Sequence, residues 1–190
     1  PNLTVECDGM GNTIDIQAWV DDYVANANVS DGCTATVDLV VTHDWDGSGF
    51  TSSCNEDIDV VFTVTDQCGN TDEVTGTISV DDSTPPNIDV PGTDLFLTCD
   101  PATNDGDILD WLASGANASY SDLCSPVGNI ILTDDYDGTP PECSMAETIT
   151  FTVEDECGQQ QTFTADLYID DFDLPSITSI ETNPAVEECN

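Results

Sequence analysis

Lysine and arginine are missing from this sequence, although 39 of its 190 residues are aspartate or glutamate. The formal net charge is −39, and only His43, the single histidine, could take part in a salt bridge between side chains. Proteins contact nucleic-acid phosphates and anionic membrane surfaces through cationic side chains. The composition therefore argues against both kinds of partner. It also predicts that metal cations or high salt relieve the repulsion between carboxylates.

Long apolar runs are missing as well. No stretch approaches the roughly 18 apolar residues that a membrane-spanning helix needs, and no signal peptide is recognisable. Nine cysteines are present in the 190 residues, and their regular placement indicates an oxidising compartment. We therefore expect an extracellular, cell-surface protein without direct membrane insertion, of which this chain is an excerpt.

The chain contains an internal repeat. Residues Phe62–Pro86, FTVTDQCGNTDEVTGTISVDDSTPP, return as Phe151–Pro175, FTVEDECGQQQTFTADLYIDDFDLP. In each copy, apolar and polar residues alternate as in a half-buried strand. Turn residues at Gln67–Asn70 interrupt the first copy, and proline ends both copies. Each copy is therefore predicted to be a β-hairpin with an exit linker, and the repetition predicts two domains.

The repeat sets the domain boundaries. The first domain spans residues 1–86 and the second spans residues 87–176, a size that builds a thin sandwich core and benefits from cross-links. Residues 177–190 look like the start of a third, truncated repeat. The cysteines agree with this division, because four fall in each complete repeat and Cys189 is left as the first cysteine of the next one.

Each domain is expected to contain one short helix among its strands. After the first strand, apolar residues recur with helical spacing at Asp15–Val24 and at Asp107–Leu112. Ala25–Val29 is predicted to be a small strand, and Ala35–Thr42 a stronger one. The pattern therefore predicts an all-β protein with one short helix after the first strand of each domain.

Four sequence elements recur in a fixed order and carry a family resemblance. After a first-strand cysteine they are IQAWVDDYV, SDGC, FTVTDQCGN, which a further cysteine precedes, and TISVDDSTPP, and with its second copy the pattern spans nearly the whole chain. In this order they resemble the HYR-like (hyalin-repeat-type) immunoglobulin-like repeats, which are abundant in giant surface and gliding adhesins of Bacteroidetes. The second repeat departs from the family pattern at Gly158-Gln159 and at Leu174-Pro175, without changing the strand pattern. The resemblance implies tandem immunoglobulin-like β-sandwich domains, an extracellular location and a role in adhesion or as a spacer, with no shared catalytic residues.

The expected strand directions predict the disulfide pairing. If the first strand descends through the domain, Cys7 and Cys54 lie at the bottom, and Cys33 and Cys68 lie at the top. Pairing within each domain then gives Cys7–Cys54, Cys33–Cys68, Cys99–Cys143 and Cys124–Cys157. Cys189 should be unpaired or bonded outside this chain. Zinc binding is disfavoured, because zinc sites usually contain cysteines separated by only a few residues.

Acidic loops offer oxygen ligands for calcium. Asp44 and Asp46 precede a glycine, and the same topology places them at the bottom of the first domain, beside Asp81 and Asp82 of the exit linker. Carboxylates that meet there would repel each other strongly without a cation. The predicted calcium ligands are Asp44, Asp46, Asp81 and Asp82, and in the second repeat Asp135, Asp137, Asp170 and Asp171. The alternative is that these groups stay solvated and that proline alone stiffens the linker.

Catalytic arrangements find little support. His43 has Asp134 as its counterpart in the second repeat, so a histidine-based triad would exist in one repeat only. No lysine is present for Schiff-base chemistry, and nothing singles out one carboxylate pair for glycoside hydrolysis. Trp19 and Trp111 could stack on sugars, but their helical spacing from apolar neighbours favours core packing. We therefore expect a protein that is not an enzyme.

Four positions are candidate glycosylation sites. Asn2, Asn28 and Asn117 each begin an N-x-[ST] sequon. Ser83 lies in Asp-Ser-Thr, which resembles the short O-glycosylation signal of Bacteroidetes surface proteins. Such modification would place these positions on the surface.

The sequence thus predicts a structural repeat of an adhesin stalk or cell-surface filament, stiffened by disulfides and by calcium. Its expected partners are neighbouring repeats of the same chain or identical subunits. One alternative is a polymerising filament subunit, in which residues 177–190 complete a neighbouring chain. Another is a carbohydrate-binding module of a secreted enzyme. Exposed aromatic residues in a groove would favour this module, and burial of Trp19 and Trp111 would argue against it.

Overall fold

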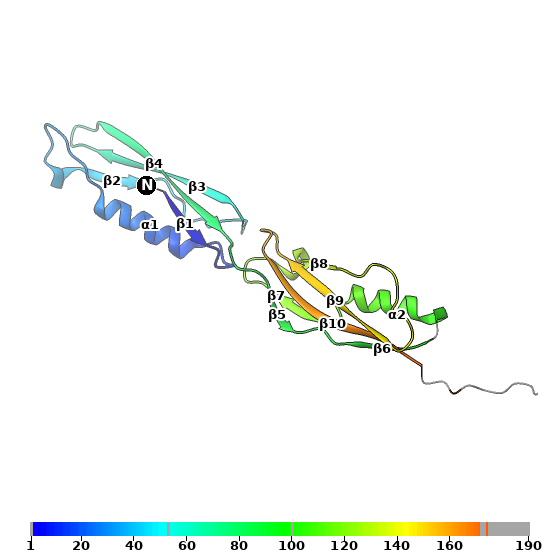
Figure 1. Ribbon diagram of the computed structural model, residues 1–190. Helices are drawn as coiled ribbons and strands as arrows, with labels where there is room; N and C mark the ends of the chain where they lie inside the picture. Colours follow the sequence, from blue (N-terminus) through cyan, green and yellow to red (C-terminus); the bar gives the residue numbers. More distant parts are fainter. Residues whose placement is uncertain (1, 53, 100, 172–173, 175–190) are drawn as a thin grey trace, which may run out of the picture.

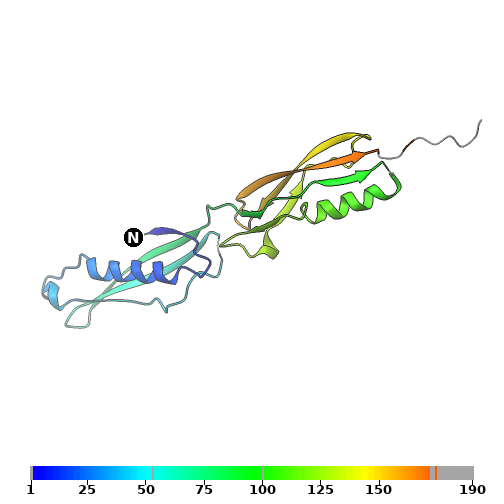
Figure 2. The ribbon, with the colours of Figure 1, turned by 90° about the horizontal axis from the view of Figure 1, so that it is seen from below.

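The protein consists of two four-stranded β-sheets placed end to end (Figure 1). The computed structural model describes residues 2–52, 54–99, 101–171 and 174. The first sheet is built from residues that precede the linker 82–86, and the second from residues that follow it. Both views show the sheets as consecutive units of one elongated molecule (Figures 1 and 2).

In the first domain, one strand is followed by a helix and then by three further strands. The elements are β1 (Leu3–Glu6), α1 (Thr13–Asn26), the 3₁₀ turn η1 (Thr36–Asp38), β2 (Val40–His43), β3 (Glu56–Thr65) and β4 (Thr71–Asp81). The sheet order is β1-β4-β3-β2, with β1 parallel to β4 and the other neighbours antiparallel. Strands β1 and β4 therefore both run toward the linker, as the predicted strand directions require.

The second domain repeats this plan and adds a small sheet. Its elements are β5 (Asn87–Val90), β6 (Leu95–Thr98), α2 (Pro101–Ala113), β7 (Ser119–Ser121), η2 (Val127–Asn129), β8 (Ile131–Asp134), β9 (Met145–Glu154) and β10 (Gln160–Asp170). The main sheet has the order β6-β10-β9-β8, and β5 pairs with β7 beside it. The equivalence of the two main sheets shows that the sequence repeat is a repeat of structure.

The core of each domain lies between the sheet and its helix. Because side chains alternate along a strand, Val60 and Phe62 of β3 turn inward together with Ile78 and Val80 of β4, and all four are at most 2% exposed. Ile16 and Val20 of α1 complete this cluster. Helix α2 contributes Ile108, Trp111 and Leu112 to the equivalent cluster of the second domain. The helices thus replace much of a second sheet as the covering layer.

The two helical tryptophans belong to these cores. Trp19 meets Phe62 edge-on at a ring distance of 5.6 Å, and Trp111 meets Phe151 in the same way at 5.5 Å. Trp111 is only 5% exposed, and its indole N–H donates to the carbonyl of Thr93 at 2.8 Å. Core packing of both residues, as the helical spacing predicted, is therefore confirmed.

The predicted class, all-β with tandem sandwich domains and one helix after the first strand of each sheet, is confirmed. Two local predictions in the first domain are wrong. Ala25–Val29 is not a strand, because α1 continues to Asn26. Ala35–Thr42 is divided between η1 and the shorter strand β2. In the second domain, the counterpart of Asn28–Ser30 is β7, which is a strand because β5 pairs with it.

Candidate junction site between the domains

The bottom of the first domain and the top of the second meet closely. Cys7 follows β1 directly, and its N–H donates to the carbonyl of Asp81 at the end of β4. The next turn contains Gly9 with φ +70, a conformation that suits glycine. A β-carbon at Gly9 would collide with the carbonyl oxygen of Leu123 in the second domain. The contact between the domains therefore involves the backbone itself.

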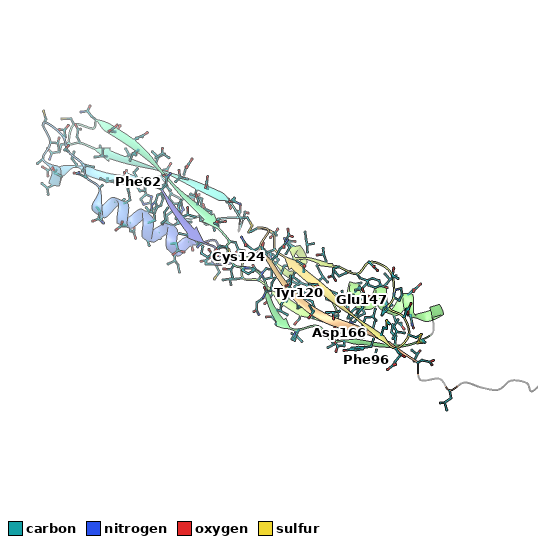
Figure 3. The ribbon with its side chains drawn as sticks, viewed as in Figure 1. Phe62, Phe96, Tyr120, Cys124, Glu147 and Asp166 are labelled. Atoms are coloured by element: carbon teal, nitrogen blue, oxygen red, sulfur yellow. A yellow bond between two sulfur atoms is a disulfide. The ribbon has the colours of Figure 1, made fainter. Side chains whose placement is uncertain are left out.

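Two disulfides cross this contact. Cys7 is bonded to Cys124 with the Cα atoms 6.0 Å apart, and Cys54 is bonded to Cys157 with the Cα atoms 5.4 Å apart. Figure 3 shows Cys124 where the two domains meet. Together with the linker, the bonds attach the domains through three covalent connections.

The predicted pairing is correct for one bond and wrong for the others. Cys99 and Cys143 are bonded, with the Cα atoms 5.7 Å apart, as predicted. Cys7–Cys54, Cys33–Cys68 and Cys124–Cys157 do not form. The predicted ends of the domain are right, but the prediction treated each domain as self-contained. Because the bottom of one domain faces the top of the next, bottom cysteines bond to top cysteines across the junction.

The second domain presents its two junction cysteines on loops that are fixed by aspartates. Asp122 Oδ1 accepts hydrogen bonds from the N–H groups of Cys124 and Ser125, both at 2.7 Å. Asp155 Oδ1 accepts from the N–H of Cys157 at 2.8 Å. Ser125 Oγ also accepts from the backbone N–H of Glu156, which ties the loops together. The cysteine backbones are therefore held by contacts within the second domain as well as by the disulfides.

Carboxylates gather around these disulfides. Asp82 is 1% exposed and lies within 4.8 Å of potential ligand atoms of Asp122 and Cys124. Burial raises the pKa of Asp82, the N–H of Thr84 opposes this, and the charges of Asp122, Asp155 and Glu6 raise the pKa further. Asp82 is therefore destabilised in its charged form at neutral pH.

An unpaired oxygen marks the same place. Asp155 is 3% exposed, and its Oδ2 is buried without a hydrogen-bond partner. Asp82 Oδ2 lies 3.8 Å from Cys157 Sγ, a disulfide sulfur that carries no hydrogen to donate. Buried carboxylate oxygens in this state cost free energy unless a cation neutralises them. Hard oxygen ligands of this kind fit calcium, whereas the disulfide sulfur of Cys124 does not.

Unlike Asp82 and Asp155, Glu6 at the junction is fully engaged in hydrogen bonds to the linker. Its carboxylate accepts from the N–H and hydroxyl of Ser83, both at 2.9 Å, and from the hydroxyl of Thr84 at 3.0 Å. The hydrogen bonds to Ser83 lower the pKa of Glu6, and that to Thr84 lowers it further. These bonds fix the linker against the end of β1.

The structure does not bring the predicted calcium ligands of the first repeat together. Asp44 Oδ1 accepts from the N–H of Val61 at 2.8 Å, and Val61 lies halfway along β3. Glu56, the first residue of β3, pairs with Val80, which directly precedes Asp81, and lies roughly 17 Å from Val61 at about 3.3 Å per residue. The loop after β2 therefore begins beside the middle of the sheet and not at its end.

The second repeat has the same arrangement. Asp135 Oδ1 accepts from the N–H of Thr150, and Asp137 Oδ1 caps the following turn at Thr139. Asp170, the last residue of β10, pairs with Thr98, and Asp171 follows it. Both therefore lie beyond the part of the sheet that Asp135 contacts. In the first repeat, Asp46 likewise caps its own turn at Ser48, and Asp81 is exposed at the end of β4. Of the eight predicted ligands, only Asp82 belongs to the carboxylate group at the junction.

Sequence reasoning missed Glu6, Asp122 and Asp155. A signal for the two aspartates was present, because an aspartate precedes each top cysteine by two residues in SDGC, SDLC, TDQC and EDEC.

The candidate glycosylation positions Asn2, Asn28, Asn117 and Ser83 are all exposed. Cys189 and the rest of the predicted third repeat lie outside the described residues.

Comparisons with known proteins give weak similarity only. No family model matches the chain, and no curated protein matches it. Among solved structures, Drosophila N-cadherin EC1-4 matches with a TM-score of 0.36 and 13% identity, over 70% of this chain and 41% of that one. Human mucin-like protocadherin EC1-2 matches with a TM-score of 0.32 and 11% identity, over 88% of this chain and 94% of that one. Sidekick-1 immunoglobulin domains 1-4 match with a TM-score of 0.26 and 10% identity, over 70% of this chain and 44% of that one. The chain thus spans less than half of the first of these structures, and we transfer no ligand or partner from them.

Among the described residues, no helix has the length and apolar character needed to cross a membrane.

Proposed function

We propose that this chain is a non-catalytic structural segment of an extracellular adhesin stalk or cell-surface filament, built from HYR-like repeats. The observation that carries the proposal is the pair of disulfides, Cys7–Cys124 and Cys54–Cys157, that crosses the junction between the domains. A flexible peptide linker alone would let two domains bend and twist. Three covalent connections at separate points oppose both motions, which is what a stalk under load requires. Disulfides also persist in oxidising, extracellular compartments.

Removal of these bonds tests the proposal. In a variant with serine at Cys7, Cys54, Cys124 and Cys157, small-angle X-ray scattering should show a smaller radius of gyration and a broader distance distribution. The Cys99→Ser/Cys143→Ser variant is the matched control, because its bond lies inside one domain, and it should keep the dimensions of the unmodified protein. Equal dimensions for both variants would contradict a stiffening role.

We further propose that calcium binds at the junction, with Asp82, Asp122 and Asp155 as ligands. Two observations support this site: the buried Asp155 Oδ2 has no hydrogen-bond partner, and the buried Asp82 has a potential ligand atom within 4.8 Å of one of Asp122. Backbone carbonyls and water can supply the rest of the shell, because calcium accepts flexible sets of oxygens. A cation there would also lower the repulsion that a chain of net charge −39 cannot relieve internally.

Calorimetric titration with calcium checks this site. Asp122→Asn should lower the affinity about tenfold or more, because a charged ligand is lost. Asp46→Asn is the matched control, since Asp46 is exposed and caps its own turn, and the amide oxygen of the asparagine can still accept from the N–H of Ser48. Equal affinities for the two variants, or no binding by the unmodified protein, would refute the site.

A carbohydrate-binding module is the less favoured function. Trp19 and Trp111, the residues that could have formed a sugar platform, pack on phenylalanines in the two cores. The structural role therefore agrees better with where the aromatic residues lie.

A further inference from the structure

The top of the first domain carries two cysteines whose counterparts are bonded in the second domain. Cys33 and Cys68 are exposed and have no disulfide partner within the described part of the chain. Figure 1 shows their loops, near η1 and the turn between β3 and β4, at the end of the molecule remote from the second domain. Their equivalents, Cys124 and Cys157, carry the bonds across the junction.

The two free cysteines are held as their bonded counterparts are. Asp31 Oδ1 accepts from the N–H of Cys33 at 2.8 Å and from that of Thr34 at 2.6 Å. Asp66 Oδ1 accepts from the N–H of Cys68 and that of Asn70, both at 2.8 Å. These bonds reproduce those of Asp122 and Asp155 in the second domain. A common pocket lined by residues of both loops shows that the loops are neighbours.

The opposite end of the molecule carries the matching pair. The N–H of Cys99 donates to the carbonyl of Asp170 at 3.1 Å, as the N–H of Cys7 donates to that of Asp81 at 2.9 Å. Cys143 precedes β9 just as Cys54 precedes β3. In the first domain, the bottom cysteines bond to the next domain. In the second, they bond to each other.

We infer that Cys33 and Cys68 are the docking site for the bottom of a second copy of this chain, which bonds to them through its Cys99 and Cys143. The resulting head-to-tail fibre would repeat between copies the junction seen within one copy. This inference rests on the proposed structural function. It adds that the binding partner is a second copy of the chain and that disulfides join the two copies. By equivalence with Cys7–Cys124 and Cys54–Cys157, the expected bonds are Cys33–Cys99 and Cys68–Cys143.

The bonds form in two balanced steps. The Cys33 thiol loses its proton to solvent, and the thiolate attacks the Cys99 sulfur of the second copy. The Cys33–Cys99 bond forms as Cys99–Cys143 breaks, and Cys143 leaves as a thiolate that takes up a proton. Joining Cys143 to Cys68 then requires the removal of two electrons and two protons. A small-molecule disulfide such as oxidised glutathione accepts them and is reduced to two thiols.

Two variants with one end blocked test the inference. Cys33→Ser/Cys68→Ser blocks the top, Cys99→Ser/Cys143→Ser blocks the bottom, and all proteins carry Cys189→Ser to remove the ninth cysteine. The proteins are incubated in glutathione redox buffer with excess calcium and about 0.5 M sodium chloride, where the Debye length is only about 4 Å. Folding is checked by circular dichroism, and the four substituted positions lie at the ends of the molecule.

The expected result is a ladder of covalent oligomers for the protein with both ends intact, seen by electrophoresis without reductant. Each blocked variant alone stays monomeric, and their mixture gives one covalent dimer and nothing larger. Peptide mapping of the dimer finds Cys33–Cys99 and Cys68–Cys143. A monomeric mixture, a ladder from either blocked variant, or bonds between two tops would overturn the inference. The same map reports Cys7–Cys124 and Cys54–Cys157, so failure of the proposed function, in which these bonds are absent, is distinguishable from failure of the docking alone.

Discussion

At the scale of single residues, Asp82 is a buried carboxylate in a chain that has no lysine or arginine to pair with it. Its carboxylate lies at the junction, where Asp122 and Asp155 also raise its pKa. In most proteins the side chain of a lysine or arginine would neutralise such a carboxylate, and the chain has neither. The charge of Asp82 can instead be removed by protonation or balanced by a bound metal cation.

Asp82→Asn should therefore stabilise the protein in the presence of a chelator at pH 7. A raised pKa in the folded state means that the native protein binds the proton more tightly than the unfolded chain does. The stability from this group is thus complete below about pH 3.9, the unfolded value, and is lost as the pH rises through the folded value. The difference in melting temperature between Asp82→Asn and the unmodified protein should be positive at pH 7 and shrink toward acid pH. A difference that grows on acidification would contradict the assignment.

At the scale of secondary-structure elements, each helix closes the core over its sheet. Helix α2 does so through Trp111, which combines an edge-on contact with Phe151 and a hydrogen bond to the Thr93 carbonyl. The segment after β5 is thereby fixed to the helix. One residue thus joins the helix, the main sheet and the segment between β5 and β6 of the second domain.

Trp111→Ala should destabilise the second domain by about 3–5 kcal/mol, as large aromatic truncations in cores do. Leu109→Ala on the same helix is the control, because Leu109 is 62% exposed, and it should change stability by less than about 0.5 kcal/mol. Urea unfolding followed by circular dichroism measures both. Comparable losses for the two variants would mean that the helix does not pack as described.

At the scale of the whole molecule, repulsion among carboxylates opposes the compact state. Because the chain has no cationic side chain apart from His43, screening can only weaken unfavourable interactions between side chains. The elongated arrangement of the domains spreads this charge along the molecule (Figure 2). The disulfides hold the two domains together against it.

Sodium chloride should therefore raise the melting temperature steadily, with a chelator present to exclude calcium. Most of the rise should fall below about 0.3 M, where the Debye length decreases to about 6 Å. Differential scanning calorimetry between low and high salt measures the effect. Potassium chloride is the control and should act equally, because screening depends on ionic strength and not on the cation. A melting temperature that is constant or falls with salt would show that repulsion does not limit stability.

The sequence by itself determined what depends on local pattern. Alternation along β3 and β4 predicted these two strands, helical spacing around Trp19 and Trp111 predicted the helices, and the repeat predicted that the plan occurs twice. It also placed Cys7 and Cys54 at the bottom of the first domain, since strand direction follows from the order of short connections.

Only the tertiary structure decided which groups meet across the boundary between the domains. Cysteine spacing alone does not decide whether Cys7 bonds within its own domain or to Cys124, because Cys54 and Cys124 both lie far from Cys7 along the chain. The carboxylates follow the same rule: Asp82 meets Asp122 and Asp155 because the second domain docks on the first, whereas Asp44 is held at mid-sheet by the register of β2 on β3. Contacts within an element follow the periodicity of the chain, but contacts between domains depend on how two complete surfaces fit.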